Sequence, residues 1–335
     1  MNRSPNKITR IPSLYLLRCV CMFMIVMIHY PIAGANDCLP ILRAAVPAFF
    51  MTSGYFLFTA QREEMKTHLI KACRKMVWLI LYANVIYFLL KLVLYLAAPS
   101  SNFLPLTTFS DWVNVIFTGS VMLEYLWYLT AYLETLAVFL ILLHFRLEKI
   151  LFRLVPLLIL MGLLVGKYSF LIGLPEALPL AVSRNFLTIG LPCFAVGYFI
   201  ACHEQQILQK IGRALPVLSM LLVVAAWGEG RLLACVGRLG DLFILSLPLA
   251  TALFLLCLQH KQFASHTVLA RIGEQHALNI YLFQAVVAGL VVGIFAHFFG
   301  MNITPYVAPL TFVGSLLLSV VINGARERLI GFTKK

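Results

Sequence analysis

The first apolar run of the chain, at 13–31, contains two ionisable residues, Arg18 and His29. They stand eleven positions apart, so a helix at about 100° and 1.5 Å per residue places both on one face, about 16 Å apart along its axis. Histidine, with an unperturbed pKa of about 6.5, can take a proton from a hydroxyl near neutral pH and return it to a leaving group. The pair therefore indicates an acid–base site, because an ionisable residue inside a span is costly without a polar setting. The simpler alternative is an arginine that reaches the headgroups and an interfacial histidine.

A second cluster consists of Lys71, Arg74 and Lys75, in what we expect to be a cytoplasmic loop after the second span. Cations at such a place can attract an anionic ligand. Ordinary positive-inside topology would explain the cluster equally well. Lysine also lacks the bidentate fork of arginine, which leaves the individual ligand contacts open.

Several polar residues near span ends are further candidates. Ser53, Tyr55 and Tyr128 carry hydroxyls that could donate hydrogen bonds to a bound ligand. Glu124, expected on the outer side, could orient His29 or bind a hydroxyl. Packing explains the first three residues more simply, and contact with interfacial water explains Glu124 more simply.

The elements that position these residues are membrane-spanning helices. Of the 335 residues, 61% are hydrophobic and only 12% are charged, which is far too apolar for a water-soluble domain. With about 20 apolar residues needed per crossing, we predict an all-α, polytopic transmembrane bundle of ten spans that forms one domain over 1–335. The predicted spans are 13–31, 42–60, 77–98, 122–144, 150–167, 185–202, 214–228, 241–259, 276–299 and 305–324.

The charge distribution gives the orientation. Most of the 26 Lys and Arg residues fall in one alternate set of connections and in the two termini. The positive-inside rule therefore places both termini in the cytoplasm, as an even number of spans requires. The net charge of +13 follows from this topology and does not indicate nucleic-acid binding. The eight cysteines form no CxxC pair and no metal-like spacing with histidine, so we expect reduced packing residues and no metal site.

Five stretches in order resemble membrane acyltransferase family three, which includes bacterial glycan O-acyltransferases. They are the Arg-x10-His pair of the first span, Pro47 to Tyr55, Leu126 to Leu129, Pro192 to Tyr198, and Ile272-Gly273 followed by Leu278 to Leu282. The resemblance covers nearly the whole chain. It departs from the family at Gln284, where a histidine is frequent, and at Ala277, where serine is usual.

The resemblance implies transfer of an acyl group, acetyl above all, from cytoplasmic acyl-CoA to a hydroxyl of a cell-envelope glycan or lipid-linked saccharide. It implies a bacterial inner-membrane enzyme with acetyl-CoA as donor substrate, with membrane lipid around it and without a metal. The expected catalytic residues are His29, Arg18 and Glu124. The expected donor-binding residues are Arg18, Lys71, Arg74 and Lys75, and the expected substrate-binding residues are Ser53, Tyr55, Trp127 and Tyr128.

Two other classes stay open at this point. A multi-pass transporter or flippase also has buried charges and helices interrupted by Gly or Pro, but it predicts an internal repeat that the halves 1–160 and 161–335 do not show convincingly. The second class is a membrane scaffold without catalytic activity, in which Arg18 and His29 would contribute only to topology and packing. His68, His144, His203, His260, His266 and His276 fall in or beside expected cytoplasmic loops and are assigned no chemistry.

Overall fold

The computed structural model describes residues 10–32, 34–97, 126–174, 180–236, 240–299 and 304–333. Within these ranges all regular secondary structure is helical, which confirms the all-α class. The chain divides into two compact units, each of which is described by itself. Unit 1 contains residues 50–204 and 237–243, and unit 2 contains residues 7–49, 205–236 and 244–335. The single domain expected over 1–335 stays a prediction.

The elements of unit 1 are α4 (Arg62–Ala97), α6 (Trp127–His144), α7 (Glu148–Val165), η2 (Ser169–Ile172), α8 (Leu180–Ser183) and η3 (Phe186–Gly190). Those of unit 2 are α1 (Pro12–His29), α2 (Leu39–Leu42), η4 (Gly212–Ala214), α10 (Leu215–Leu233), α11 (Ser246–Gln259), α12 (Val268–Gln275), α13 (Ala277–Phe299), η5 (Thr304–Tyr306) and α14 (Val307–Thr333). The helices α3 (Ala45–Leu57) and α9 (Leu191–Ile211) each contribute residues to both units.

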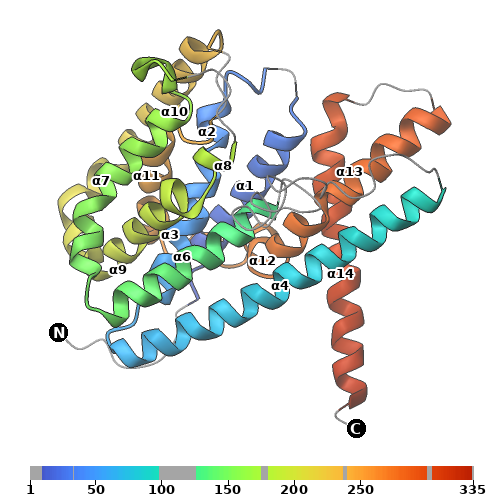
Figure 1. The fold of residues 1–335 in the computed structure, drawn as a ribbon, viewed down its shortest axis with the longest axis horizontal. Coiled ribbons are helices and arrows are strands. Elements are labelled where there is room, and N and C mark those ends of the chain that lie inside the picture. The colour runs from blue at the N-terminus through green and yellow to red at the C-terminus, as the bar shows by residue number, and fades with distance from the viewer. Residues whose placement is uncertain are drawn as a thin grey trace. The chain divides into compact units, whose positions relative to one another are not determined.

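The core of unit 1 is built by α4, α6, α7 and α9. The helices α4 and α6 lie side by side (Figure 1). Their apolar faces bury Leu69 and Leu136 completely, at 0% exposure. Phe139 of α6 packs against Phe194 and Tyr198 of α9, with ring centroids 4.8 and 5.1 Å apart. Close packing of these large apolar groups stabilises the unit.

Two glycines let α3 and α9 approach each other at backbone distance within unit 1. A Cβ on Gly54 would overlap the carbonyl oxygen of Phe194, and a Cβ on Gly197 would overlap that of Met51. Small residues permit such contacts between membrane helices, where van der Waals packing is a principal attractive force. This close approach of α3 and α9 explains why glycine occupies position 54 of the Ser53-Gly54-Tyr55 motif and position 197 of the Gly197-Tyr198 motif.

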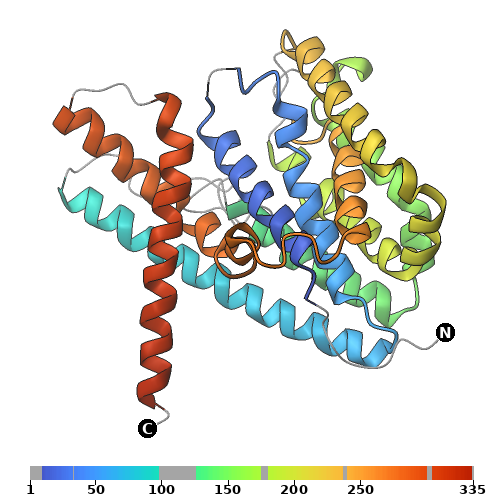
Figure 2. The ribbon, with the colours of Figure 1, turned by 180° about the vertical axis from the view of Figure 1, so that it is seen from behind.

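In unit 2, α1 packs against α12, α13 and α14 (Figure 2). Pro12 stands in the first turn of α1, where its missing N–H costs no helical hydrogen bond. The closest approach to α12 is at Gly273, since a Cβ there would overlap the carbonyl oxygen of Tyr15. Two turns further along α1, Phe23 meets Phe312 of α14 edge to face, with centroids 5.4 Å apart.

The start of α1 is tied to the connection between α11 and α12. The N–H of Ser13 donates to the carbonyl of Lys261 at 3.3 Å, and its hydroxyl donates to the carbonyl of Cys257 at 2.7 Å. Arg10 forms an ion pair with Glu274. These contacts hold the start of α1 against the connection between α11 and α12 within unit 2.

Each predicted span coincides at least in part with helix. Six segments of the described chain are long and apolar enough to cross a membrane: Pro12–His29, Arg62–Val93, Trp127–His144, Phe186–Leu233, Ala277–Phe295 and Val307–Arg328. The count of ten spans and the cytoplasmic position of both termini stay predictions. Pro156 lies inside α7, which is continuous through it.

One expectation is wrong. Lys71, Arg74 and Lys75 lie on α4, which begins at Arg62, and not in a loop. Hydropathy indicates only the apolar part of a helix, so the span predicted from it begins at 77 and not at Arg62. The preceding turns are nevertheless helical, because Glu63 and Glu64 occupy the first turn, where acidic residues interact favourably with the helix dipole.

Candidate functional site

The first span of the sequence is a single helix with Arg18 and His29 on one face. Both side chains are half-buried, and His29 is the last residue of α1. Met22 and Ile25, which occupy the same face between them, are only 1% and 7% exposed. This face of α1 therefore points into unit 2 between the arginine and the histidine. The rise along the helix axis between Arg18 and His29 is about 16 Å, as expected.

Tyr55 of unit 1 takes part in a buried polar contact that the sequence did not indicate. Its hydroxyl donates a 2.7 Å hydrogen bond to Glu204 Oε2, and the two residues are 8% and 6% exposed. A carboxylate this deep needs such donors, since an unpaired buried charge is strongly destabilising. Ser53, two residues earlier on α3, is half-buried. The substrate-binding roles expected for Ser53 and Tyr55 stay predictions.

Aromatic side chains surround the start of α6 in unit 1. Trp127 is 7% exposed and begins the helix. Tyr128 stacks on Tyr132 with centroids 6.0 Å apart and an interplanar angle of 8°, and it packs against Phe50 at 4.9 Å. These ring contacts hold Tyr128 against Phe50 and Tyr132. Contact of Trp127 and Tyr128 with a substrate stays a prediction.

The predicted outer carboxylate, Glu124, lies outside the described residues. A second carboxylate, Glu134, stands two turns inside α6, and Thr130 is one turn before it on the same face. Glu134 Oε2 and Thr130 Oγ1 are buried and have no hydrogen-bond partner among the described residues. Sequence reasoning missed this pair, although an acidic residue inside an otherwise apolar span is itself a signal.

The cations Lys71, Arg74 and Lys75 of α4 are exposed. Lys71, Arg74 and Lys75 share one helix face, which continues into exposed Trp78 and Tyr82. Tryptophan and tyrosine are enriched at membrane–water interfaces, where lysine and arginine reach the headgroups. The arrangement fits cations at the polar edge of a lipid-facing helix, from which they can attract anionic ligands over a distance.

A polar network joins α12, α13 and α14 in unit 2. His276 Nδ1 lies 2.8 Å from Ser319 Oγ, which also accepts a 3.0 Å hydrogen bond from Asn279 Nδ2. The amide nitrogen of Asn323 donates to the Gln275 carbonyl and lies 3.4 Å from His276 Nδ1. Because an amide nitrogen only donates, Nδ1 is the accepting nitrogen of a neutral imidazole. Burial lowers the pKa of His276, in agreement with this assignment.

The network continues as a buried stripe on α14. Thr311, Ser315 and Ser319 follow at four-residue intervals, and all three are 0% exposed. Gln284 of α13 is 1% exposed, and neither of its amide atoms has a hydrogen-bond partner in the described part of the chain. The same holds for the hydroxyls of Thr311 and Ser315. The sequence signal for this stripe is the i, i+4, i+8 spacing of hydroxyl residues in an apolar helix.

The predicted site residues thus fall into two groups. Arg18 and His29 belong to unit 2, together with the polar stripe of α14, and the remaining described candidates belong to unit 1.

A family model described as an acyltransferase domain matches residues 11–324. The chain belongs to acyltransferase family 3. The resemblance read from the sequence is thereby confirmed, and the match includes the helices of both units. No characterised protein and no solved structure shows a significant match to the chain.

Membership makes this acyltransferase a multi-pass membrane enzyme for acyl transfer. The transporter reading is therefore not favoured. The eight cysteines of the acyltransferase are all free, and three of them, Cys19, Cys21 and Cys193, are buried. No disulfide cross-links the described elements, so packing, hydrogen bonds and ion pairs hold the helices together.

Proposed function

We propose that this acyltransferase transfers an acyl group, acetyl in the simplest case, from cytoplasmic acyl-CoA to a hydroxyl of a cell-envelope glycan or lipid-linked saccharide. The proposed location is the bacterial inner membrane. The observation that carries the proposal is the placement of Arg18 and His29 on one inward face of α1 in a chain of this family.

The proposed reaction needs a base next to the acceptor. His29 takes the proton of the acceptor hydroxyl while the oxygen attacks the thioester carbonyl carbon. The C–S bond then breaks, and the protonated imidazole returns the proton to the CoA thiolate. The electron pair of the C–S bond leaves with sulfur, so the step requires no metal and no redox partner.

The cations have separate proposed tasks. Arg18 stands at the cytoplasmic end of the same helix face and pairs with a negatively charged group of the donor. Lys71, Arg74 and Lys75, exposed on α4, raise the local concentration of the anionic donor by long-range attraction. Added salt should therefore weaken donor binding moderately, because exposed charges are screened within about 8 Å at physiological ionic strength.

The test is incubation of the purified acyltransferase with radiolabelled acetyl-CoA and a candidate glycan. The wild type is compared with His29→Ala, with Arg18→Ala and with His144→Ala, a control at an exposed histidine that ends α6. Label in the glycan with wild type and His144→Ala, and its loss in the other two variants, supports the proposal. Acyl transfer that survives in His29→Ala would contradict the role of His29 as the base. A wild type that binds no CoA would favour a carrier.

A further inference from the structure

A polar cavity of about 310 Å³ lies in unit 2 where α1 begins. Its wall includes six polar or charged side chains: Arg10, Tyr15, Ser265, His266, Thr267 and Arg271. A ligand pocket typically measures about 300–1,000 Å³, so this cavity has room for one end of a larger ligand and not for a whole coenzyme.

The electrostatic character of the cavity is positive. Arg10 is paired with Glu274, whereas no ion pair or side-chain hydrogen bond of Arg271 is found in the described part of the chain. Arginine presents a planar fork of donors that matches the oxygens of a phosphate. His266 and the hydroxyl of Ser265 add further groups that can donate to such an oxygen. These groups together suit a phosphate-bearing ligand.

The local fold explains why these side chains converge. Thr267 is the N-cap of α12: its hydroxyl accepts from the N–H of Ala270 at 3.3 Å and donates to the Ala264 carbonyl at 2.9 Å. The turn brings Ser265 and His266 to the positive end of α12 and directs Arg271, one turn later, to the same side. The contacts of Ser13 with Lys261 and Cys257 hold this turn against the start of α1.

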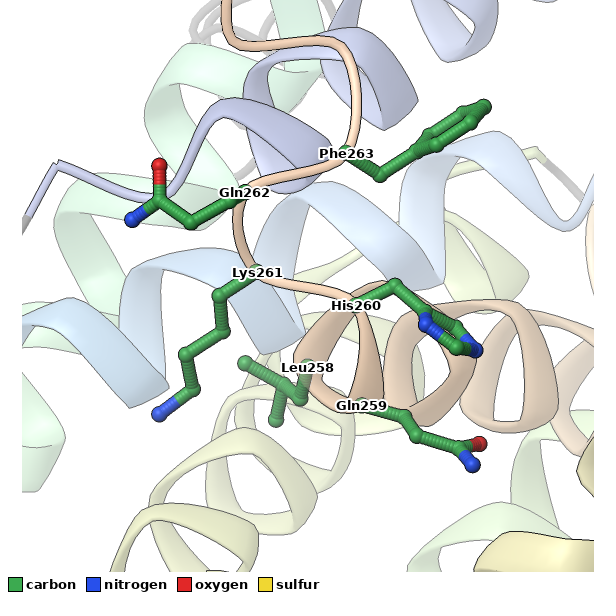
Figure 3. A pocket seen from close by; sticks show the side chains of 6 residues that line it. All are labelled: Leu258, Gln259, His260, Lys261, Gln262 and Phe263. Atoms are coloured by element: carbon green, nitrogen blue, oxygen red, sulfur yellow. The ribbon is translucent and has the colours of Figure 1, made fainter.

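A neighbouring depression on the same connection lacks this convergence. It is formed by residues 258–263, and Figure 3 shows the side chains of His260 and Lys261 extending in different directions. A multiply charged ligand needs several donors aimed at one place. The cavity beside Arg271 is therefore a candidate binding site for such a ligand, and the depression at 258–263 is not.

We propose that this cavity binds the phosphate-bearing nucleotide end of the acyl-CoA donor, an inference that rests on the proposed function. Arg271 is the principal phosphate contact, with Arg10 and His266 beside it. Tyr15, in the cavity wall, lies one turn before Arg18 on α1. The distance along the helix from Tyr15 to His29 is about 21 Å, so an extended thioester arm that starts at the cavity passes Arg18 and ends near His29.

The first test measures binding and does not depend on turnover. Calorimetry with detergent-solubilised protein compares CoA and adenosine 3′,5′-bisphosphate on the wild type, Arg271→Gln, Arg271→Lys and Arg213→Gln, a control at an exposed arginine of η4. We expect Arg271→Gln to weaken both ligands at least tenfold, Arg271→Lys to recover part of the loss, and the control Arg213→Gln to change binding less than twofold. Arg271 is exposed, so these variants retain the fold, which a melting curve checks.

The second test uses a donor without a nucleotide. Arg271→Gln should raise the KM for acetyl-CoA without changing kcat, and it should leave the rate with S-acetylpantetheine unchanged. Equal CoA affinity of wild type and Arg271→Gln overturns the cavity assignment and leaves the proposed function intact. A wild type that binds no CoA at all overturns the proposed function itself.

The phosphate group of a lipid headgroup could also bind in this cavity. The binding measurements are therefore repeated in nanodiscs of neutral lipid and in nanodiscs with anionic lipid. Adenosine 3′,5′-bisphosphate binding in neutral nanodiscs that is lost in Arg271→Gln supports the donor site. Absence of that binding, together with loss of co-purified anionic lipid in Arg271→Gln, assigns the cavity to lipid and contradicts the inference.

Discussion

The hydroxyl of Tyr55 donates a 2.7 Å hydrogen bond to Glu204 Oε2 in the interior of unit 1. Tyr55→Phe removes this donor while it preserves the ring. The free energy of unfolding should fall by about 1–3 kcal/mol, because a buried charged acceptor loses a partner. Thermal melting of the purified protein measures the change. Tyr306→Phe, at a tyrosine that is 63% exposed, is the control and should leave the melting temperature unchanged. Equal melting temperatures of Tyr55→Phe and wild type would show that this hydrogen bond contributes nothing to stability.

His276 makes stability depend on pH. Its pKa is lowered in the folded protein by burial, so the unfolded chain binds the proton more readily. Stability is therefore complete above the unfolded pKa of about 6.5 and decreases as the pH falls through and below that value. The melting temperature should drop between pH 7.5 and 5.5, and His276→Gln should reduce that drop. A drop of the same size in His276→Gln would contradict the role of His276.

The contact between α1 and α12 depends on Gly273. Gly273→Ala introduces a Cβ that overlaps the Tyr15 carbonyl, so we expect a loss of about 1–3 kcal/mol and reduced acyl transfer. Gly228→Ala is the matched control, since a Cβ there meets no atom within 4 Å and alanine favours a helix over glycine by about 1 kcal/mol. Melting should therefore move in opposite directions in the two variants.

Arg146 follows α6 in a left-handed conformation, with φ of 59°. The N–H of Leu147 bonds the Leu142 carbonyl at 2.8 Å, and the N–H of Arg146 bonds the Leu143 carbonyl at 3.4 Å, which is a Schellman ending. Glycine adopts this backbone without strain, so Arg146→Gly should stabilise the protein by about 1 kcal/mol. Arg153→Gly, inside α7, should destabilise it by a similar amount. Chemical unfolding of both variants checks the signs.

The sequence predicts the helices well where a membrane-length apolar run has a clear end. The span predicted at 13–31 is α1, Pro12–His29, because Pro12 fixes its start. The sequence prediction fails at the start of α4. Charged residues that favour a helix precede the apolar run there, so the helix begins at Arg62, before the predicted span. Periodicity also places Arg18 and His29 on one face, since this depends only on residues within one helix.

Features that depend on long-range pairing could not be predicted. Tyr55 meets Glu204 across 149 positions of sequence, and spacing within either helix gives no sign of that contact. The cavity beside Arg271 likewise requires Arg10, which comes from the other end of the chain. A single sequence records the residue types of such a site but not which distant segments meet.

The central claim is that His29 acts as the base of acyl transfer. The most direct measurement is kcat for the acetylated glycan together with the Kd for CoA, for wild type, His29→Ala and His29→Gln. Because a positioned base contributes about 10²–10⁴-fold to rate, kcat should fall by at least 10²-fold in both variants while the Kd stays within about twofold. A kcat close to that of the wild type in either variant would contradict the claim.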